Sequence, residues 1–342
     1  MESTGAWTCS CPYSRSDEVI LRRDAPVRFP IPGLCFSHKP GNRLGPGGEG
    51  RDGFTPGFGG PGGCPRLGWR AGIRVAELKI LDGCLWTRRK KEGIEMTDKE
   101  RFKRDLLELG VKPGDMVLVH SSMKALGTEC APEEIIDAME EVLGEEGTLL
   151  MPALTYENMT AEQPVFDSAA TEPCIGLLPR TFLHRPGVER SVHPTHSVCA
   201  KGKMAHRLTV GHSMDDTAVG PHSPFMLLPL FGGKLLFIGD IMQSCTFMHG
   251  IETILKPPYI RQTPSPVFTV DGQARQYVAN DGYGWGSEFQ RIEEILEEPD
   301  IRRGKLLAAN AYLIDARALF AAALLKMWAE PYAFITDISA YI

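Results

Sequence analysis

Histidine is the residue type in this chain best suited to chemistry, because an imidazole gains and loses a proton close to neutral pH. The sequence has nine histidines, and eight of them follow residue 95. Two neighbourhoods place an imidazole near an arginine or a carboxylate, at 190–197 and 245–252. Such combinations serve general acid–base catalysis and the binding of charged substrates.

The segment RSVHPTHS spans 190–197 and surrounds Pro194, which fixes the chain in a non-helical turn. His193 is a candidate general base, and Arg190 is a candidate anchor for a phosphate or carboxylate. A turn whose polar side chains bond only to one another would have the same sequence. The spacing alone does not decide between these interpretations.

The segment CTFMHGIE spans 245–252 and follows the apolar run GKLLFIGD at 233–240. If a helix begins here, His249 and Glu252 lie three positions apart on one helix face. The carboxylate then orients the imidazole for proton transfer. An HxxE pair also arises often by chance, so a surface ion pair is the alternative.

A third segment, VHSSMKALG at 119–127, ends a short apolar run in small polar residues. Ser121, Ser122 and Gly127 offer hydroxyl and backbone N–H groups to an anionic ligand. Serine-rich strand ends are common, so this signal is the weakest of the three.

The elements that must position these residues follow an alternating order, which favours an α/β layered domain with a mixed sheet. A helix is predicted at 97–109, with Thr97 as its N-cap. Further predicted helices lie at 132–143, 176–183, 287–296 and 316–328. Predicted strands lie at 116–122, 147–155, 196–202 and 233–240, with a hairpin at 266–279 that turns at Asp271-Gly272. Neither GxGxxG nor a Walker-type phosphate loop occurs, which argues against a dinucleotide-binding fold.

Composition divides the chain at Met96. Of its 342 residues, 37 are basic and 43 are acidic. The part before Met96 holds 15 of the basic and 10 of the acidic residues. Residues 96–342 therefore hold 22 basic and 33 acidic residues, which gives this part a net charge of −11. About half of the 36 glycines also precede Met96. We therefore expect a disordered Gly/Pro-rich extension at 1–95 and one domain at 96–342. Lys91-Glu92-Gly93 matches a translated ribosome-binding site, so the extension is hypothesised to be an upstream translation artefact.

The positions of apolar residues and of cysteines in the sequence exclude several classes of protein. No apolar run is long enough for a membrane-spanning helix, and the first residues lack the apolar core of a signal peptide. Five of the nine cysteines precede Met96 and the rest are scattered singly, so neither disulfides nor a zinc cluster is indicated. HExxH is absent. A cytoplasmic protein is expected.

Taken in chain order, the separated blocks resemble the aminoglycoside 3-N-acetyltransferase family over nearly all of 96–342. The blocks are VHSSMKALG, GTLLMPALTYEN, PVFDSAAT, LLPRTFLHRPGVERSVHPTHSVCAKG, VGPHSPFMLL, GGKLLFIGD, TFMHGIE and GKLLAANAYLIDARAL. The resemblance implies a three-layer α/β/α domain with a mixed central sheet. It also implies acetyl transfer from acetyl-coenzyme A to the 3-amino group of a 2-deoxystreptamine aminoglycoside, which gives antibiotic resistance.

The resemblance also assigns roles to residues. His193, His249 and Glu252 are the expected catalytic residues, with His193 favoured as the base. Asp167, Glu157 and Tyr156 are expected to contact the substrate. The residues expected to serve the coenzyme or the oxyanion are Ser121, Ser122, Gly127, Arg190, Ser191 and Thr246. Neither a metal nor a protein nucleophile is expected.

The expected partners are a small cationic amine and coenzyme A, with no nucleic acid and no membrane, for a monomer or a homodimer. The acidic net charge would attract a polyamine and repel nucleic acid. One alternative is an acetyltransferase of the same fold that acts on another small amine. Others are a metal-dependent hydrolase that uses His193, His196 and His249, and a binding protein without enzymatic activity.

Overall fold

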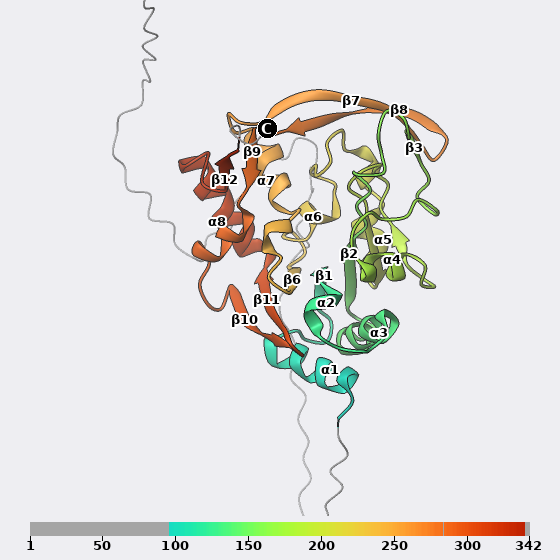
Figure 1. Cartoon of the computed structure of the whole chain (residues 1–342), viewed down its shortest axis with the longest axis vertical. Coiled ribbons are helices and arrows are strands. Elements are labelled where there is room, and N and C mark those ends of the chain that lie inside the picture. The colour runs from blue at the N-terminus through green and yellow to red at the C-terminus, as the bar shows by residue number, and fades with distance from the viewer. Residues whose placement is uncertain (1–95, 283, 339–342) are drawn as a thin grey trace, which may run out of the picture. The chain divides into compact units, whose positions relative to one another are not determined.

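The computed structural model of the 342-residue chain describes residues 96–282 and 284–338. The extension expected at 1–95 lies outside the described residues, so the prediction of disorder there is untested. The described part is built on a central sheet with helices on both faces, and Figure 1 shows this arrangement.

The central sheet has seven strands, and it is mixed as predicted. Strand β1 lies between β6 and β2 and pairs with both in parallel, whereas the remaining pairs are antiparallel. In spatial order the strands are β10 (Ile301–Leu306), β11 (Ala309–Asp315), β6 (Lys234–Ile238), β1 (Met116–Ser121), β2 (Thr148–Pro152), β5 (Val198–Gly202) and β4 (Glu189–Arg190).

One face of the sheet is covered by α1 (Asp98–Leu109), α3 (Pro132–Leu143) and α4 (Leu177–Leu183). Helix α1 begins as predicted after Thr97, whose hydroxyl accepts a hydrogen bond from the backbone N–H of Glu100 at 3.3 Å. Apolar side chains from these helices and from the strands form one buried cluster. Burial of that apolar surface holds the layer on the sheet.

The opposite face is covered by α5 (Ala205–Thr209), α6 (Pro224–Leu227), α7 (Met248–Leu255) and α8 (Ala316–Ala329). Strand residues alternate between the two faces, so Leu118 and Phe237 pack on this side whereas Val119 and Leu236 pack on the other. The predicted three-layer α/β/α architecture is therefore confirmed.

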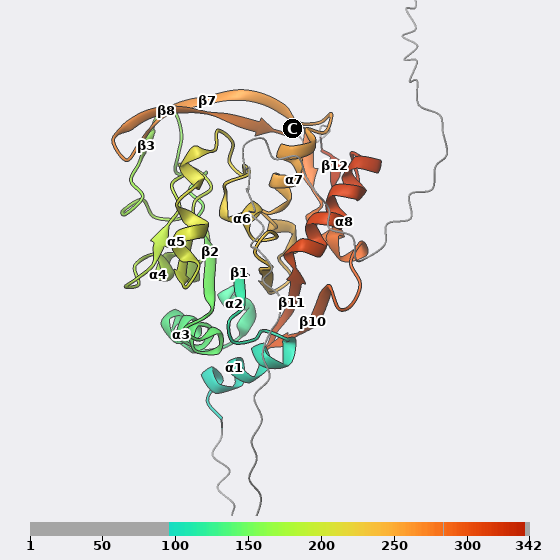
Figure 2. The same cartoon turned by 180° about the vertical axis from the view of Figure 1, so that it is seen from behind.

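A long two-stranded arm crosses one end of the molecule, as Figures 1 and 2 both show. It consists of β7 (Arg261–Val270) and β8 (Gln273–Asp281), and the short strand β3 (Val165–Phe166) pairs with β7. The predicted turn at Asp271-Gly272 is confirmed, with both residues at positive φ. The hairpin is longer than the sequence pattern predicts, because most β7 side chains are exposed and do not alternate.

One prediction of local structure is wrong, and one pair of strands was not predicted. Residues 287–296 do not form an α-helix: β9 (Trp285–Ser287) pairs with β12 (Ile335–Asp337), and a 3₁₀ helix, η3, follows at Phe289–Glu294. Phe289 and Ile292 are its buried side chains, and their spacing of three fits the tighter helix. The antiparallel pair β10–β11 was not predicted, because the four middle residues of β10 are all exposed and give no alternation.

The carboxyl ends of β1, β2 and β6 meet at one edge of the sheet. After β1 the chain runs to β2 on one side, whereas after the adjacent parallel strand β6 it runs to β10 and β11 on the other side. Ligands of open α/β sheets bind where connections diverge in this way. The two histidine segments enter this edge: 191–197 leads into β5, and 245–252 follows the 3₁₀ helix η2 (Met242–Ser244) after β6. Within the described residues, no helix has the length and apolarity that crossing a membrane requires.

Candidate functional site

Four imidazoles gather at this edge of the sheet. The ring of His196 lies 6.3 Å from that of His249 and 6.1 Å from that of His193, measured between centroids. His193 also stacks on His212 at 5.1 Å. The rings come from the loop at 191–197, from the 3₁₀ helix η1 (His212–Met214) and from α7, so the fold joins segments that are far apart in sequence.

His249 forms a dyad with Glu252 on α7. Nδ1 of His249 lies 2.6 Å from Oε2 of Glu252, and the hydroxyl of Tyr259 donates to Oε1 of Glu252 at 2.9 Å. Glu252 is only 4% exposed, whereas the His249 side chain is 42% exposed. A proton on Nδ1 satisfies the carboxylate, so the accessible Nε2 has a free lone pair. This is the arrangement of an oriented general base.

Tyr259 keeps its proton in this arrangement. Burial raises the pKa of Tyr259 above its ordinary value, and the adjacent Glu252 carboxylate raises it further. The hydroxyl therefore remains a donor, and it holds Glu252 in place for His249.

The geometry around His193 differs from that of a base. Its Nδ1 faces the backbone N–H groups of Thr195 and His196, which donate at 3.2 and 3.1 Å, so the proton of the neutral ring is on Nε2. That Nε2 is buried and has no hydrogen-bond partner among the described residues. Burial, followed by the nearby His212 and His196, holds the pKa of His193 well below its ordinary value. His193 is therefore an uncharged anchor for the loop.

His212 also serves the fold. The hydroxyl of Ser191 accepts from the backbone N–H of Val198 and donates to Nδ1 of His212, at 2.8 and 2.9 Å. Nε2 of His212 then donates to the carbonyl oxygen of Ala218 at 3.3 Å. Burial lowers the pKa of His212 to about 4. Because Ser191 is fully buried in this chain of bonds, its geometry does not favour the expected contact with coenzyme.

Arg190 likewise does not favour its expected role at a phosphate. Its guanidinium donates to Oγ of Ser197 at 2.8 Å and to the carbonyl oxygens of Ala153 at 3.0 Å and Thr171 at 2.5 Å. It also lies 4.9 Å above the ring of Phe166. Burial lowers the pKa of Arg190. These bonds tie together β2, β5 and the loop that precedes α4.

The loop after β1 remains a candidate for coenzyme contacts. Ser122 caps the short helix α2 (Met123–Leu126) by accepting from the backbone N–H of Ala125 at 3.3 Å. Ser121 is half-buried and makes no side-chain hydrogen bond within the described residues. Gly127 ends α2 at a φ of 60°, where a Cβ would lie 3.1 Å from the Cβ of Ala308. Its role in the structure is therefore conformational.

Thr246 lies three residues before His249, at the entrance to α7. It is 6% exposed, and its hydroxyl makes only a long contact, 3.5 Å, with the carbonyl oxygen of Ser244. A hydroxyl so weakly engaged can donate to a negative charge that develops nearby.

The expected substrate residues lie along 156–167, which is mostly exposed. The ring of Tyr156 lies 6.1 Å from that of His196, so Tyr156 borders the imidazole cluster. Glu157 is exposed beside it. Asp167 uses Oδ1 to accept from the backbone N–H groups of Ala169 and Ala170, at 2.8 and 3.2 Å. Asp167 therefore closes its own turn with Oδ1, and the residue is exposed.

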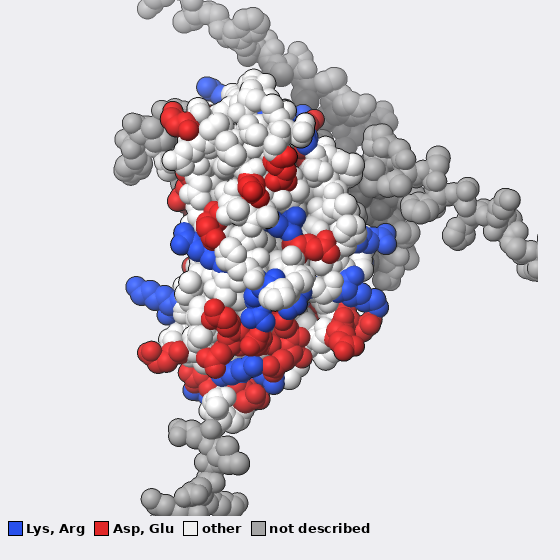
Figure 3. Space-filling view, turned by 90° about the vertical axis from the view of Figure 1, so that its right-hand side faces the viewer, with Lys and Arg blue, Asp and Glu red and all other residues white. Residues whose placement is uncertain are grey.

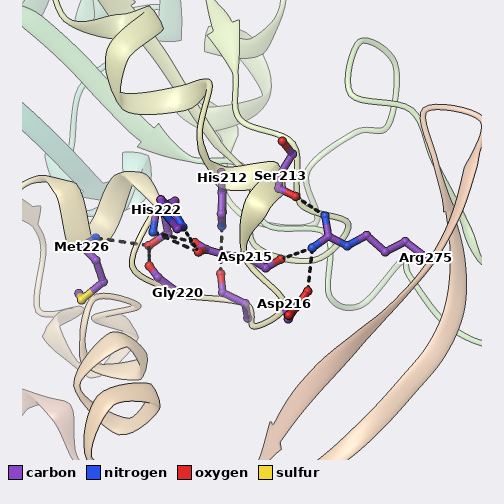
Figure 4. Close-up of polar contacts among 10 residues, drawn as sticks. His212, Ser213, Asp215, Asp216, Gly220, His222, Met226 and Arg275 are labelled. Atoms are coloured by element: carbon purple, nitrogen blue, oxygen red, sulfur yellow. Dashed lines mark hydrogen bonds and ion pairs between the residues drawn. The ribbon is translucent and has the colours of Figure 1, made fainter. Parts of the chain in front are cut away.

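A second carboxylate–imidazole pair lies in the loop before α6, and Figure 4 shows it. Asp215 is buried and accepts from Nδ1 and the backbone N–H of His222, with the Nδ1 contact at 2.7 Å. Arg275 reaches from β8 to the carbonyl oxygens of Ser213 and Asp215 and to the Asp216 carboxylate. Burial raises the pKa of Asp215. These contacts fasten the arm to the loop.

Acidic side chains are unevenly distributed. On the face in Figure 3, they gather at the end of the molecule where α1 and α3 lie. Lys99 and Lys103 both pair there with Glu141. The face shown therefore gives no support to an acidic field focused on the imidazoles.

Two other chemistries lack the necessary geometry. Burial raises the pKa of both Cys199 and Cys245 to about 12, so neither thiol is ionised at neutral pH. No group of three His, Cys, Asp or Glu side chains in the described ranges is arranged to hold a metal ion. The described ranges therefore contain no set of metal ligands that would support the alternative of a metal-dependent hydrolase.

Comparison with known proteins gives consistent results. The family model for aminoglycoside 3-N-acetyltransferase matches residues 118–327. The chain is 31% identical over 253 residues to aminoglycoside N(3)-acetyltransferase VII of Streptomyces paromomycinus, covering 64% of this chain and 87% of that protein. It is 34% identical over 205 residues to aminoglycoside N(3)-acetyltransferase III of Serratia marcescens, covering 54% and 76%.

Solved structures agree with the sequences. Aminoglycoside acetyltransferase AAC(3)-Xa superposes with a TM-score of 0.61 at 28% identity, over 67% of this chain and 92% of that one. A mutant of AAC(3)-IVa in complex with a gentamicin superposes with a TM-score of 0.62 at 29% identity, over 71% of this chain and 93% of that one. The AAC-IIIb binary structure with CoASH gives 0.58 at 26% identity, over 69% and 97%.

Proposed function

The chain belongs to the aminoglycoside 3-N-acetyltransferase family, and on that premise we propose that its His249–Glu252 dyad is the base of acetyl transfer to an aminoglycoside. The observation that carries this assignment is the contrast between two histidines. His249 is accessible and oriented by a buried carboxylate, whereas His193 is buried with Nδ1 already bonded.

The ammonium group of the acceptor has no lone pair until it releases one proton to solvent, and the resulting amine must lose a second proton as its nitrogen attacks the carbonyl, which requires a base. Nε2 of His249 accepts a proton as the 3-amino group bonds to the thioester carbon of acetyl-coenzyme A. The resulting imidazolium lies against the Glu252 carboxylate, which stabilises its charge. The same proton can then pass to the departing sulfur, so that the products are an amide and a thiol.

The negative charge that develops on the thioester oxygen needs donors. We assign this role to the hydroxyl of Thr246 and to the loop at Ser121–Ser122, which remain available in the structure. The same loop is suited to the pantetheine arm of coenzyme A. Arg190 and Ser191 are left out of the coenzyme site because their polar atoms are engaged in the fold.

On the acceptor side, Tyr156 borders the imidazole cluster and the exposed Glu157 follows it in the chain, and we assign both to contacts with the amino sugar. The relatives that include gentamicin or coenzyme A in their structures support this substrate pair. Acetylation at the 3-amino group removes a positive charge from the drug, which is how such an enzyme confers resistance.

The test is an assay of the purified full chain with acetyl-coenzyme A and gentamicin, following thiol release and the position of the new amide by NMR. Acetylation at the 3-amino group supports the proposal. Turnover with another small amine, and none with any 2-deoxystreptamine drug, would contradict the substrate assignment while leaving the dyad chemistry in place.

A further inference from the structure

His196 occupies a position between two groups that the proposed function uses. Its ring centroid lies 6.3 Å from that of His249 and 6.1 Å from that of Tyr156. The planes of His196 and His249 are nearly perpendicular, at 87°. A group that is hydrogen-bonded to Nε2 of His249, about 3 Å from that atom, therefore lies near the His196 ring.

The imidazole of His196 is held from one side only. Its Nδ1 lies 2.8 Å from the hydroxyl of Thr195, whereas its Nε2 makes no hydrogen bond within the described residues. The loop itself is fixed to the end of β2, because Thr155 bonds to the carbonyl oxygens of Pro194 and Thr195 at 2.5 and 2.9 Å. Nε2 is thus a positioned polar atom without a partner in the described part of the fold.

His196 also remains uncharged. Burial, together with the nearby His249 and His212, lowers its pKa to about 3. A neutral imidazole can bond to a hydroxyl or an amine of a polycationic sugar without repelling it.

We propose that His196 is a specificity-determining residue of the acceptor site, where its Nε2 bonds to a second polar group of the amino sugar whose reacting amine faces His249. This inference rests on the proposed function. It assigns no proton transfer to His196, so removing Nε2 should weaken acceptor binding and leave the chemical step intact.

Substitution of His196 by asparagine or by glutamine distinguishes a contact with the substrate from a role in supporting the loop. His196→Asn keeps a polar atom near the position of Nδ1, toward Thr195, but lacks one at Nε2. His196→Gln reaches the Nε2 position and loses the atom near Nδ1. His184→Asn is the control, since His184 is exposed and pairs with Glu172.

Steady-state kinetics of the full chain with gentamicin and acetyl-coenzyme A provide the readout. We expect His196→Asn to raise the KM for gentamicin about tenfold, with kcat and the KM for acetyl-coenzyme A within threefold of wild type. His196→Gln should keep the gentamicin KM within about threefold, and His184→Asn should change nothing. The reverse order, with Asn tolerated and Gln impaired, would show that His196 only supports Thr195 and would overturn the proposal.

A second measurement separates a failure of this inference from a failure of the proposed function. If the wild-type chain transfers no acetyl group to gentamicin, calorimetric titration of gentamicin into the same variants replaces the kinetics. A Kd about tenfold weaker in His196→Asn than in His196→Gln supports the contact. Equal affinities, or no binding by the wild type, overturn it.

Discussion

Nδ1 of His249 lies 2.6 Å from Oε2 of Glu252, and the two residues are three positions apart on α7. The helix fixes this distance, and the hydroxyl of Tyr259 fixes the carboxylate from its other side. An imidazole held in this way has one tautomer and one free nitrogen. The orientation of the base is therefore a property of one helix and one tyrosine.

Removal of the tyrosine hydroxyl tests this support. Tyr259→Phe leaves Oε1 of Glu252 without its donor, so we expect kcat to fall several-fold and the free energy of unfolding to fall by about 1 kcal/mol. Kinetics with gentamicin and urea denaturation measure the two effects. Tyr312→Phe is the matched control, since its hydroxyl bonds to Asp240 in the bend that follows β6, away from Glu252 in the sequence. An unchanged kcat in Tyr259→Phe would show that His249 does not depend on this contact.

Arg190→Lys tests whether Arg190 serves the fold or the coenzyme. A lysine cannot donate to Ser197, Ala153 and Thr171 together, so we expect a loss of about 2–4 kcal/mol in the free energy of unfolding. The KM for acetyl-coenzyme A should stay within about twofold in the protein that remains folded. A large rise in that KM, with the stability unchanged, would restore Arg190 to the coenzyme site.

The buried histidines predict how stability depends on pH. Burial lowers the pKa of His120 to about 4, of His196 to about 3 and of His212 to about 4, so these rings are neutral in the folded chain. The unfolded chain takes up their protons at about pH 6.5. Stability is therefore fully present above that pH and declines as the pH falls toward 4, by up to about 1.4 kcal/mol per pH unit for each ring.

The measurement is Tm at a series of pH values between 7.5 and 4.5. His120→Phe removes one of the titrating groups, since His120 stacks on Phe237 and its Nε2 has no partner within the described ranges. We expect a shallower fall of Tm with decreasing pH in this variant. A Tm that is constant or rises as the pH falls would contradict the assignment of neutral rings.

The sequence was informative where a local pattern decides the structure. Helix α1, its cap at Thr97 and the turn at Asp271-Gly272 follow from residues within a few positions of one another. The i,i+3 spacing likewise placed His249 beside Glu252. The strand pair β10–β11 was not predicted because its position depends on the pairing of β11 with β6, a contact between distant segments of the chain. The middle residues of β10 are exposed, so the sequence of β10 shows no alternation.

Burial explains what the sequence could not show at the site. The sequence favours His193 over His249 as the base, and only the fold reveals that His193 is buried whereas His249 is accessible. Tyr259 was missed because α7 ends at Leu255, so helical spacing does not relate Tyr259 to Glu252, which lies seven positions earlier. For Arg190, the three acceptors that occupy its guanidinium come from separate segments of the chain.

A parallel comparison of His249→Gln and His193→Gln tests the central claim most directly. The measurement is kcat for acetyl transfer to gentamicin at neutral pH, with circular dichroism to show that both variants are folded. The account predicts that His249→Gln lowers kcat by about 10²- to 10⁴-fold, and that His193→Gln lowers it by less than about tenfold. The reverse order, with His193→Gln inactive and His249→Gln close to wild type, would contradict it.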